Sequence, residues 1–154
     1  MRRLPDAVED RLKGLPEGLI EHIERVREIA RELASLHSID VERVDLARAL
    51  DADTPLGSAR EYGIEPSPVH GGKPLLLHGP VAAEWLEREA VIDDAQVLEA
   101  VRCHTTGRSG MGPVARVVFL ADELDPSKGS RDPFQDDIAS LAREDLDRAL
   151  LRFL

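Results

Sequence analysis

Three short polar motifs interrupt the apolar C-terminal half of the chain, and each carries a side chain that can ligate a metal ion. They are residues 77–80 (LHGP), 103–108 (CHTTGR) and 119–122 (FLAD). Imidazole nitrogens and carboxylate oxygens are usual ligands of zinc, manganese and iron. A strongly polar side chain inside an otherwise apolar helix must be paired or ligated. With His22 upstream, His78, His104 and Asp122 therefore point to a metal-dependent hydrolase.

Composition bounds the kind of molecule that carries these residues. The chain has 154 residues, of which 42% are hydrophobic and 3% aromatic, so Leu, Val, Ile and Ala must fill its core. That length predicts one domain, residues 1–154. The net charge of −10 argues against nucleic acid or an anionic membrane as partner. A small anionic substrate stays open, because a metal ion and a few arginines can overcome the global field.

Cysteine usage and hydropathy indicate the compartment. Cys103 is the single cysteine, which excludes an internal disulfide and a cysteine-based zinc finger. No apolar run approaches membrane-spanning length, and residues 1–20 lack the apolar region of a signal peptide. A cytoplasmic location is the expectation. Although Cys103 precedes His104, it is expected to be a buried structural thiol, because the sequence places no base that would activate it.

The elements that would position these side chains all have helical periodicity. Helices are predicted at 6–13, 17–36, 41–50, 55–62, 80–90, 94–104, 113–121 and 134–153, with loops at 64–77, 106–113 and 125–133. Asp40 suits the N-cap of the third helix, and Pro80 and Pro113 suit first turns. Period-two alternation is absent, as is any internal repeat. The prediction is an all-α, single-domain helical bundle.

At this point the motifs resemble those of a known family. Residues 76–81, 104–108, 118–126 and 142–150 are similar to the HD-domain phosphohydrolases, and more closely to the YqeK-type symmetrical diadenosine tetraphosphatases. The resemblance spans about residues 17 to 154. It implies an HD-type helical bundle with a dinuclear metal site, commonly iron, and cleavage of diadenosine tetraphosphate into two ADP. Manganese, cobalt, nickel or zinc also suit His and Asp ligands.

The resemblance also implies roles for individual residues. His22 and Asp122 would hold the first metal, and His78 and His104 the second. Thr105, Thr106, Gly107 and Arg108 would lie beside the polyphosphate, with Arg108 as a catalytic bidentate guanidinium. Such a site would generate hydroxide at neutral pH and offset oxyanion charge. The partner would be a nucleotide or dinucleoside polyphosphate, and the oligomeric state is left open, a homodimer included.

One family motif is incomplete here. The family is named for a His-Asp doublet, roughly Leu-Leu-His-Asp-apolar-Ala-Lys, whereas residues 46–55 read LARALDADTP and the chain holds no His-Asp pair. Asp51 is the first candidate for the surviving aspartate, as metal bridge and catalytic residue, and Asp53 is the second. A lost His would remove one metal ligand. The doublet is either lost or absent with a missing segment, and this affects catalysis rather than fold.

Plainer interpretations accompany each of these assignments. His22 alone suits a hydrogen-bonded helix histidine, His78 an N-terminal capping residue, and His104 a cation favoured at a helix C-terminus. Asp122 and Arg108 equally suit solvated positions. Two further functions therefore stay open: a catalytically degenerate HD-domain protein that binds nucleotide or one metal as a sensor or scaffold, and a purely structural domain.

Overall fold

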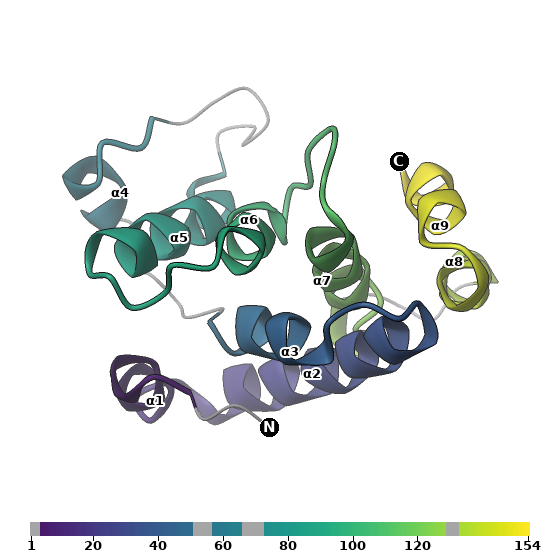
Figure 1. Ribbon diagram of the computed structural model, residues 1–154, viewed down its shortest axis with the longest axis horizontal. Coiled ribbons are helices and arrows are strands. Elements are labelled where there is room, and N and C mark those ends of the chain that lie inside the picture. Colours follow the sequence, from purple (N-terminus) through teal and green to yellow (C-terminus); the bar gives the residue numbers. More distant parts are fainter. Residues whose placement is uncertain (1–3, 51–56, 66–72, 129–132) are drawn as a thin grey trace.

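A computed structural model describes residues 4–50, 57–65, 73–128 and 133–154. The elements in these ranges are α1 (Asp6–Leu12), α2 (Glu17–Leu36), α3 (Val41–Ala49), α4 (Gly57–Glu61), the 3-10 helix η2 (Pro74–Leu77), α5 (His78–Arg88), α6 (Ala95–Cys103), α7 (Pro113–Glu123), the 3-10 helix η3 (Pro126–Lys128), α8 (Pro133–Glu144) and α9 (Leu146–Phe153). No strand occurs in the described ranges (Figure 1). The predicted all-α fold is confirmed.

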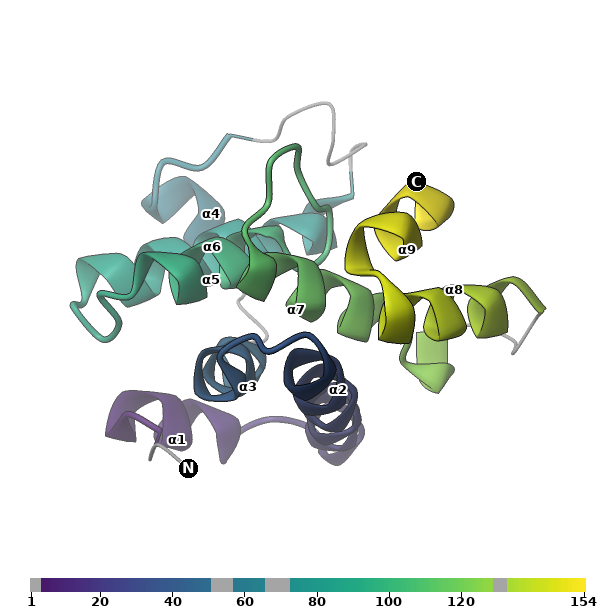
Figure 2. The ribbon, with the colours of Figure 1, turned by 45° about the vertical axis from the view of Figure 1, so that its right-hand side comes forward.

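Helix α7 is the centre of the bundle. It packs against α2 and α3 on one side, α6 on another and α9 at its end, while α5 and α6 form a pair beyond it (Figures 1 and 2). Eight of the nine α7 residues from Val114 to Asp122 are buried. A helix buried to this extent must be covered on most of its surface. Asp122, the polar member of this buried set, is therefore placed in the core, whereas Arg116 stays 33% exposed.

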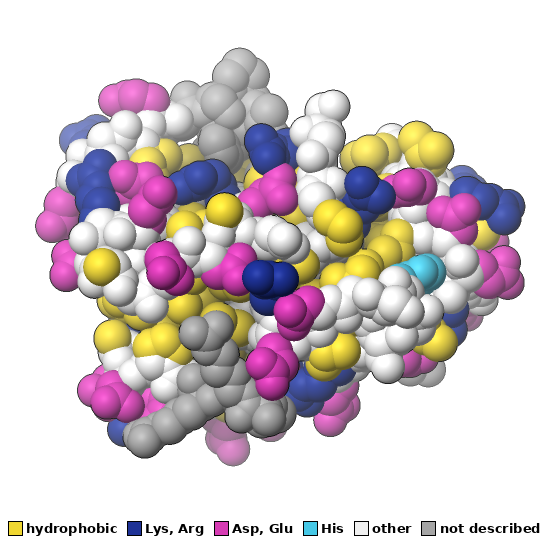
Figure 3. Space-filling model, viewed as in Figure 1, with side chains coloured by type: hydrophobic (Ala, Val, Ile, Leu, Met, Phe, Trp, Pro, Cys, Tyr) yellow, Lys and Arg dark blue, Asp and Glu magenta, His cyan; other side chains and the backbone are white. Residues whose placement is uncertain are grey.

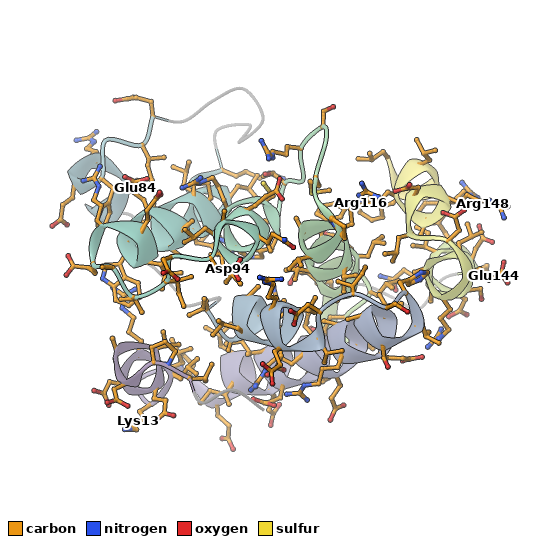
Figure 4. All side chains as sticks on the ribbon, viewed as in Figure 1. Lys13, Glu84, Asp94, Arg116, Glu144 and Arg148 are labelled. Carbon is orange, nitrogen blue, oxygen red and sulfur yellow. The ribbon has the colours of Figure 1, made fainter. Side chains whose placement is uncertain are left out.

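Aspartate side chains begin several of the helices. Asp40 accepts a hydrogen bond from the Arg43 backbone N at 3.1 Å, which confirms it as the N-cap of α3. Asp94 caps α6 in the same way and also accepts a 2.6 Å bond from Arg43 Nε, so the cap of α6 is tied to α3 (Figure 4). These caps satisfy backbone N–H groups that the helix itself leaves open.

The predicted single helix at 134–153 is wrong, because the chain breaks at Asp145. This residue is extended (φ −155°) and accepts bonds from the backbone N of Asp147 and Arg148 at 3.0 and 3.1 Å, so it caps a new helix, α9. The break turns α9 back onto α7. Arg116 Nη1 then bonds Asp147 at 2.7 Å, near the labelled Arg116 of Figure 4.

Aromatic rings complete that contact between α9 and α7. The rings of Phe119 and Phe153 meet edge to face, with centroids 5.6 Å apart and an interplanar angle of 82°, a favoured geometry for aromatic pairs. With 3% aromatic residues in the chain, this pair is a notable part of the core at that end.

A second difference lies before the His78 motif. The helix begins at His78 rather than at Pro80, and a 3-10 turn, η2, occupies the end of the predicted 64–77 loop.

None of the described helices combines the length and apolarity needed to cross a membrane. Over the face in Figure 3, basic and acidic side chains are interleaved with apolar ones between them.

Candidate metal and phosphate site

Two histidines from neighbouring helices face each other at the junction of α5 and α6. His78 is the first residue of α5 and His104 follows the last residue of α6. Their Nε2 atoms lie 2.7 Å apart, and their rings are edge to face at a centroid distance of 4.7 Å. The Thr105 hydroxyl is 3.3 Å from His78 Nε2. The structure thus brings together two of the predicted ligands with one predicted substrate contact.

Hydrogen bonds at the far side of each ring fix how the two histidines are presented. His78 Nδ1 lies 2.5 Å from the Leu75 carbonyl oxygen, and His104 Nδ1 lies 2.7 Å from the Val101 carbonyl oxygen. A carbonyl oxygen only accepts, so each Nδ1 carries the hydrogen and each neutral ring points an Nε2 lone pair at the other. Each Nε2 is thereby the ring nitrogen that is left to bind a metal ion.

The same pair fits the requirements of a metal ligand set. Metal-binding histidines commonly donate the second ring N–H to a backbone carbonyl, as both do here. Two nitrogens bound to one ion at 2.0–2.1 Å lie about 2.8–3.0 Å apart at a 90° angle and about 3.3–3.4 Å apart at the tetrahedral angle. The observed 2.7 Å spacing would therefore have to open by about 0.1–0.7 Å to admit an ion. His104 is 2% exposed, whereas His78 is half-buried. An ion would therefore reach the pair from the His78 side.

A second cluster lies on α2, α7 and η3 and contains His22. Its Nε2 is 3.5 Å from Asp122 Oδ1, and its Nδ1 contacts Asp125 Oδ2. Hydrogen bonds from Asp122 and Asp125 outweigh burial and raise the pKa of His22 above its ordinary value. The predicted first-metal pair, His22 and Asp122, is therefore together in space, with the imidazole favoured in its charged form when no metal is present.

Asp125 was not predicted, although it lies within the 118–126 motif. Its side chain is fully buried and accepts bonds from Arg25 Nε at 3.0 Å and from the Ser127 backbone N at 3.3 Å, besides its contact with His22. Burial would raise the pKa of Asp125, but the bonds from Arg25, Ser127 and His22 outweigh it and hold the pKa well below the ordinary value. Asp125 thereby orients His22.

Asp122 is held by two cationic side chains, neither of which was predicted. Arg48 Nη2, from α3, lies 3.1 Å from Asp122 Oδ1, and Lys128 Nζ, from η3, contacts Asp122 Oδ2. Burial would raise the pKa of Asp122, but the His22 bond and the charges of Arg48, His104 and Lys128 hold it well below the ordinary value.

The metal donors therefore fall into two unequal halves. Among the described residues, no group of three or more His, Cys, Asp or Glu side chains is arranged to hold a metal ion. The His78–His104 half fits one ion by its tautomers and spacing. The Asp122 half does not fit as it stands, because Arg48 and Lys128 already engage both carboxylate oxygens. The predicted bridge, Asp51, lies outside the described residues, as does Asp53.

The loop after His104 holds the remaining predicted residues. Gly107 has φ +62°, and a Cβ there would come within 3.3 Å of the Phe119 ring. The Thr106 hydroxyl bonds the Gly107 carbonyl oxygen at 3.4 Å. Arg108 contacts Glu99 of α6 and lines a groove of ≈ 440 Å³ along that helix. In this structure Arg108 is thus directed to α6 rather than to the histidine pair.

Cys103 lines the same groove and confirms its predicted burial, at 4% exposure. Burial raises the pKa of its thiol above the ordinary value, despite the opposing charge of Arg108. A thiol in this environment is a poor nucleophile at neutral pH.

One signal near the incomplete doublet was overlooked. Residues 45–48 read Asp-Leu-Ala-Arg, which matches the second half of the doublet motif with arginine in place of lysine. Asp45 accepts bonds from Arg27 Nη2 at 2.7 Å and Arg31 Nε at 2.6 Å. Burial would raise the pKa of Asp45, but the hydrogen bonds from Arg27 and Arg31 outweigh it and lower that pKa. Asp45 is thus a further candidate for the doublet aspartate, besides Asp51 and Asp53, and here it is engaged with α2.

Comparison with known proteins places this geometry in context. The chain is 36% identical over 135 residues to the symmetrical bis(5'-nucleosyl)-tetraphosphatase of Staphylococcus aureus, covering 83% of this chain and 68% of that protein. It is 31% identical over 137 residues to the protein of the same name from Bacillus subtilis, covering 85% and 73%. No family model matches the chain.

A solved structure gives the corresponding result for the fold. The crystal structure of a predicted HD superfamily hydrolase involved in NAD metabolism, from Clostridium acetobutylicum, superposes with a TM-score of 0.80 at 28% identity, covering 95% of this chain and 80% of that one.

Proposed function

We propose that this chain, which belongs to the HD-domain family of symmetrical bis(5'-nucleosyl)-tetraphosphatases, is a phosphohydrolase that cleaves a dinucleoside polyphosphate at a phosphoanhydride bond. Diadenosine tetraphosphate, giving two ADP, is the proposed substrate. The proposal includes a divalent transition metal, with iron as first candidate and manganese, cobalt, nickel or zinc as alternatives.

The observation that carries the proposal is the facing Nε2 pair of His78 and His104, 2.7 Å apart with both Nδ1 atoms turned to backbone carbonyls. These two side chains would hold the ion. When bound, a divalent ion supplies Lewis acidity and lowers the pKa of a coordinated water. The protein's own part is to hold each Nδ1 at a backbone carbonyl oxygen, so that each Nε2 is the nitrogen presented to the ion.

Cationic side chains around the pair would attract the polyphosphate to a chain whose net charge is −10. Lys128 is 33% exposed on the Asp122 side, and Arg108 is 58% exposed on the α6 side. The Thr105 hydroxyl, beside His78, is placed to donate a hydrogen bond to a phosphate oxygen. Arg108 would exchange Glu99 for a phosphate, which its planar guanidinium can bind through two N–H groups.

The test is metal analysis coupled to product analysis. Metal-free protein is supplied with Fe²⁺ or Mn²⁺ and incubated with diadenosine tetraphosphate. ADP as the single product supports the proposal, whereas ATP plus AMP would mean a different cleavage position. His104→Ala should remove bound metal and turnover together. His37→Ala is the matched control, because His37 bonds the Ala142 carbonyl oxygen far from the pair, and it should keep both.

A second candidate function is a nucleotide or metal binder without turnover. It is favoured by the absence of a three-donor group among the described residues and by the engagement of Asp122 with Arg48. A protein that binds metal and nucleotide stoichiometrically, yet releases no ADP with any of these metals, would support this alternative over the enzyme.

A further inference from the structure

We infer that the Arg48 guanidinium stands in the Asp122 half of the site in place of a second metal ion, so that this chain binds one divalent ion, at His78 and His104. The inference deepens the proposed function and rests on it for that one ion. The family resemblance leads to the opposite expectation, namely a dinuclear centre with His22 and Asp122 as ligands of its own ion.

The first argument is where the guanidinium lies. Arg48 is in the last turn of α3, which packs against α2, α6 and α7. Its side chain is 0% exposed, and Nη2 lies 3.1 Å from Asp122 Oδ1, a carboxylate that is itself 3% exposed. A buried guanidinium in this position cannot leave for solvent without unpacking α3.

The second argument is charge balance at Asp122. Its second oxygen, Oδ2, contacts the Lys128 ammonium, so each carboxylate oxygen already faces a protein cation. A divalent ion ligated by Asp122 would lie within a few ångströms of the Arg48 charge in a poorly solvated region, where like charges repel strongly. Lys128 is 33% exposed and can move away, but Arg48 cannot.

The third argument is the supply of ligands. In this half of the site His22 offers only Nε2, because Nδ1 is engaged by Asp125. Among the residues that the structure describes, Asp122 and His22 then provide two donors beside the buried Arg48 guanidinium. The other half also offers two donors, but there the Nε2 atoms of His78 and His104 face each other at 2.7 Å, with both Nδ1 atoms turned to backbone carbonyl oxygens.

The experiment measures metal stoichiometry directly. Metal-free protein is titrated with Mn²⁺ by calorimetry, and bound metal is measured after gel filtration. The expected result is one equivalent for the wild type, one for His22→Gln and Asp122→Asn with affinity changed less than about threefold, and none for His104→Ala. Two equivalents in the wild type, or loss of the bound ion in His22→Gln, would overturn the inference while leaving the proposed function intact. No uptake by the wild type would contradict both.

A second measurement tests Arg48 itself. Arg48→Met leaves a buried carboxylate with one cation fewer, so its unfolding temperature should fall, and Mn²⁺ should then raise that temperature by more than it raises the wild-type value. The additional rise should be absent in Arg48→Met/Asp122→Asn and in Arg48→Lys, the control that keeps the charge. An equal Mn²⁺ response in wild type and Arg48→Met would contradict the inference. If Arg48→Met does not fold, the stoichiometry of His22→Gln decides alone.

Discussion

Gly79 lies so close to His104 that a Cβ at residue 79 would come within 3.2 Å of the imidazole Cε1 and within 2.8 Å of the Val101 carbonyl oxygen. The start of α5 therefore meets the end of α6 through glycine backbone. Val101 is also the residue whose carbonyl oxygen accepts from His104 Nδ1. Because residue 79 is glycine and has no side chain, the two helices can approach closely and the histidine pair keeps its orientation.

Gly79→Ala should accordingly damage both the fold and the metal site. The added methyl group must push α5 away from α6, because backbone oxygen cannot yield as a flexible side chain would. We expect a loss of about 1–3 kcal/mol in the free energy of unfolding, as for other overpacked positions. Separation of His78 from His104 should weaken Mn²⁺ binding at least tenfold. Urea unfolding and calorimetric titration check the two effects.

Gly18→Ala is the matched control for that substitution. Gly18 is in the first turn of α2, and nothing lies within 4 Å of a Cβ built there. Alanine has the higher helix propensity, so this variant should gain up to about 1 kcal/mol of stability and bind Mn²⁺ as the wild type does. Equal effects of the two substitutions would mean that the α5–α6 contact does not position the histidines.

Asp125→Asn should destabilise the metal-free protein although it removes no charge at the surface. The fully buried carboxylate accepts from Arg25 and Ser127 and contacts His22, and an amide can satisfy only part of this set. A loss of about 2–4 kcal/mol is expected from breaking a buried charged network. Asp10→Asn, at an exposed pair with Lys13, should leave the urea midpoint unchanged. A similar midpoint for both variants would contradict the structural role of Asp125.

The pH dependence of stability should separate the carboxylates from His22. The pKa values of Asp122 and Asp125 are lowered from 3.8, so their contribution is present above that value and is lost as pH falls through the native pKa. The pKa of His22 is raised from 6.5. Its contribution is therefore full below pH 6.5 and is lost as pH rises through the native pKa.

This predicts a difference between wild type and His22→Gln in the presence of chelator. The free energy of unfolding of the wild type should decline between pH 6.5 and 8 more steeply than that of His22→Gln, because glutamine does not titrate. Urea unfolding at half-unit pH intervals measures it. Parallel curves over this window would show that His22 is not held between the two carboxylates in solution.

Arg108 and Glu99 make a paired prediction about substrate affinity. If the Arg108–Glu99 contact competes with the polyphosphate for the guanidinium, Glu99→Gln should lower KM for diadenosine tetraphosphate and Arg108→Ala should raise it about tenfold. Both groups are near the surface, so stability should change little. Steady-state kinetics at fixed metal concentration provide the measurement. A fall in KM for Arg108→Ala would contradict a phosphate-binding role.

Much of the architecture was predictable from local patterns. The helix at 17–36 was found with the bounds of α2, since its apolar residues recur at helical spacing, and Asp40 was found as the N-cap of α3. The break at Asp145 was missed because residues 134–153 keep a helical period through it. Aspartate is favoured at an N-cap, and Asp145 accepts from the backbone N of residues 147 and 148, but this signal competes with an uninterrupted apolar stripe.

The candidate site was predictable only in part. The motif contexts led to His78 and His104, which the structure brings into contact. Arg48 and Lys128 were not found, because a cation reaches Asp122 from α3 or η3 through tertiary packing that leaves no spacing pattern in the sequence. Asp45 does have a sequence signal, because residues 45–48 (DLAR) match the second half of the doublet motif with arginine in place of lysine.

The edge-to-face contact of Phe153 with Phe119 bears on the loop that follows His104, residues 105–108. The Phe119 ring also lies beside Gly107, where a Cβ would come within 3.3 Å of the ring. Helix α9 therefore supports the Thr105–Arg108 segment through the Phe119 ring. Replacing Phe153 with alanine would therefore affect this loop indirectly, because the Phe119 ring beside Gly107 would lose its packing partner.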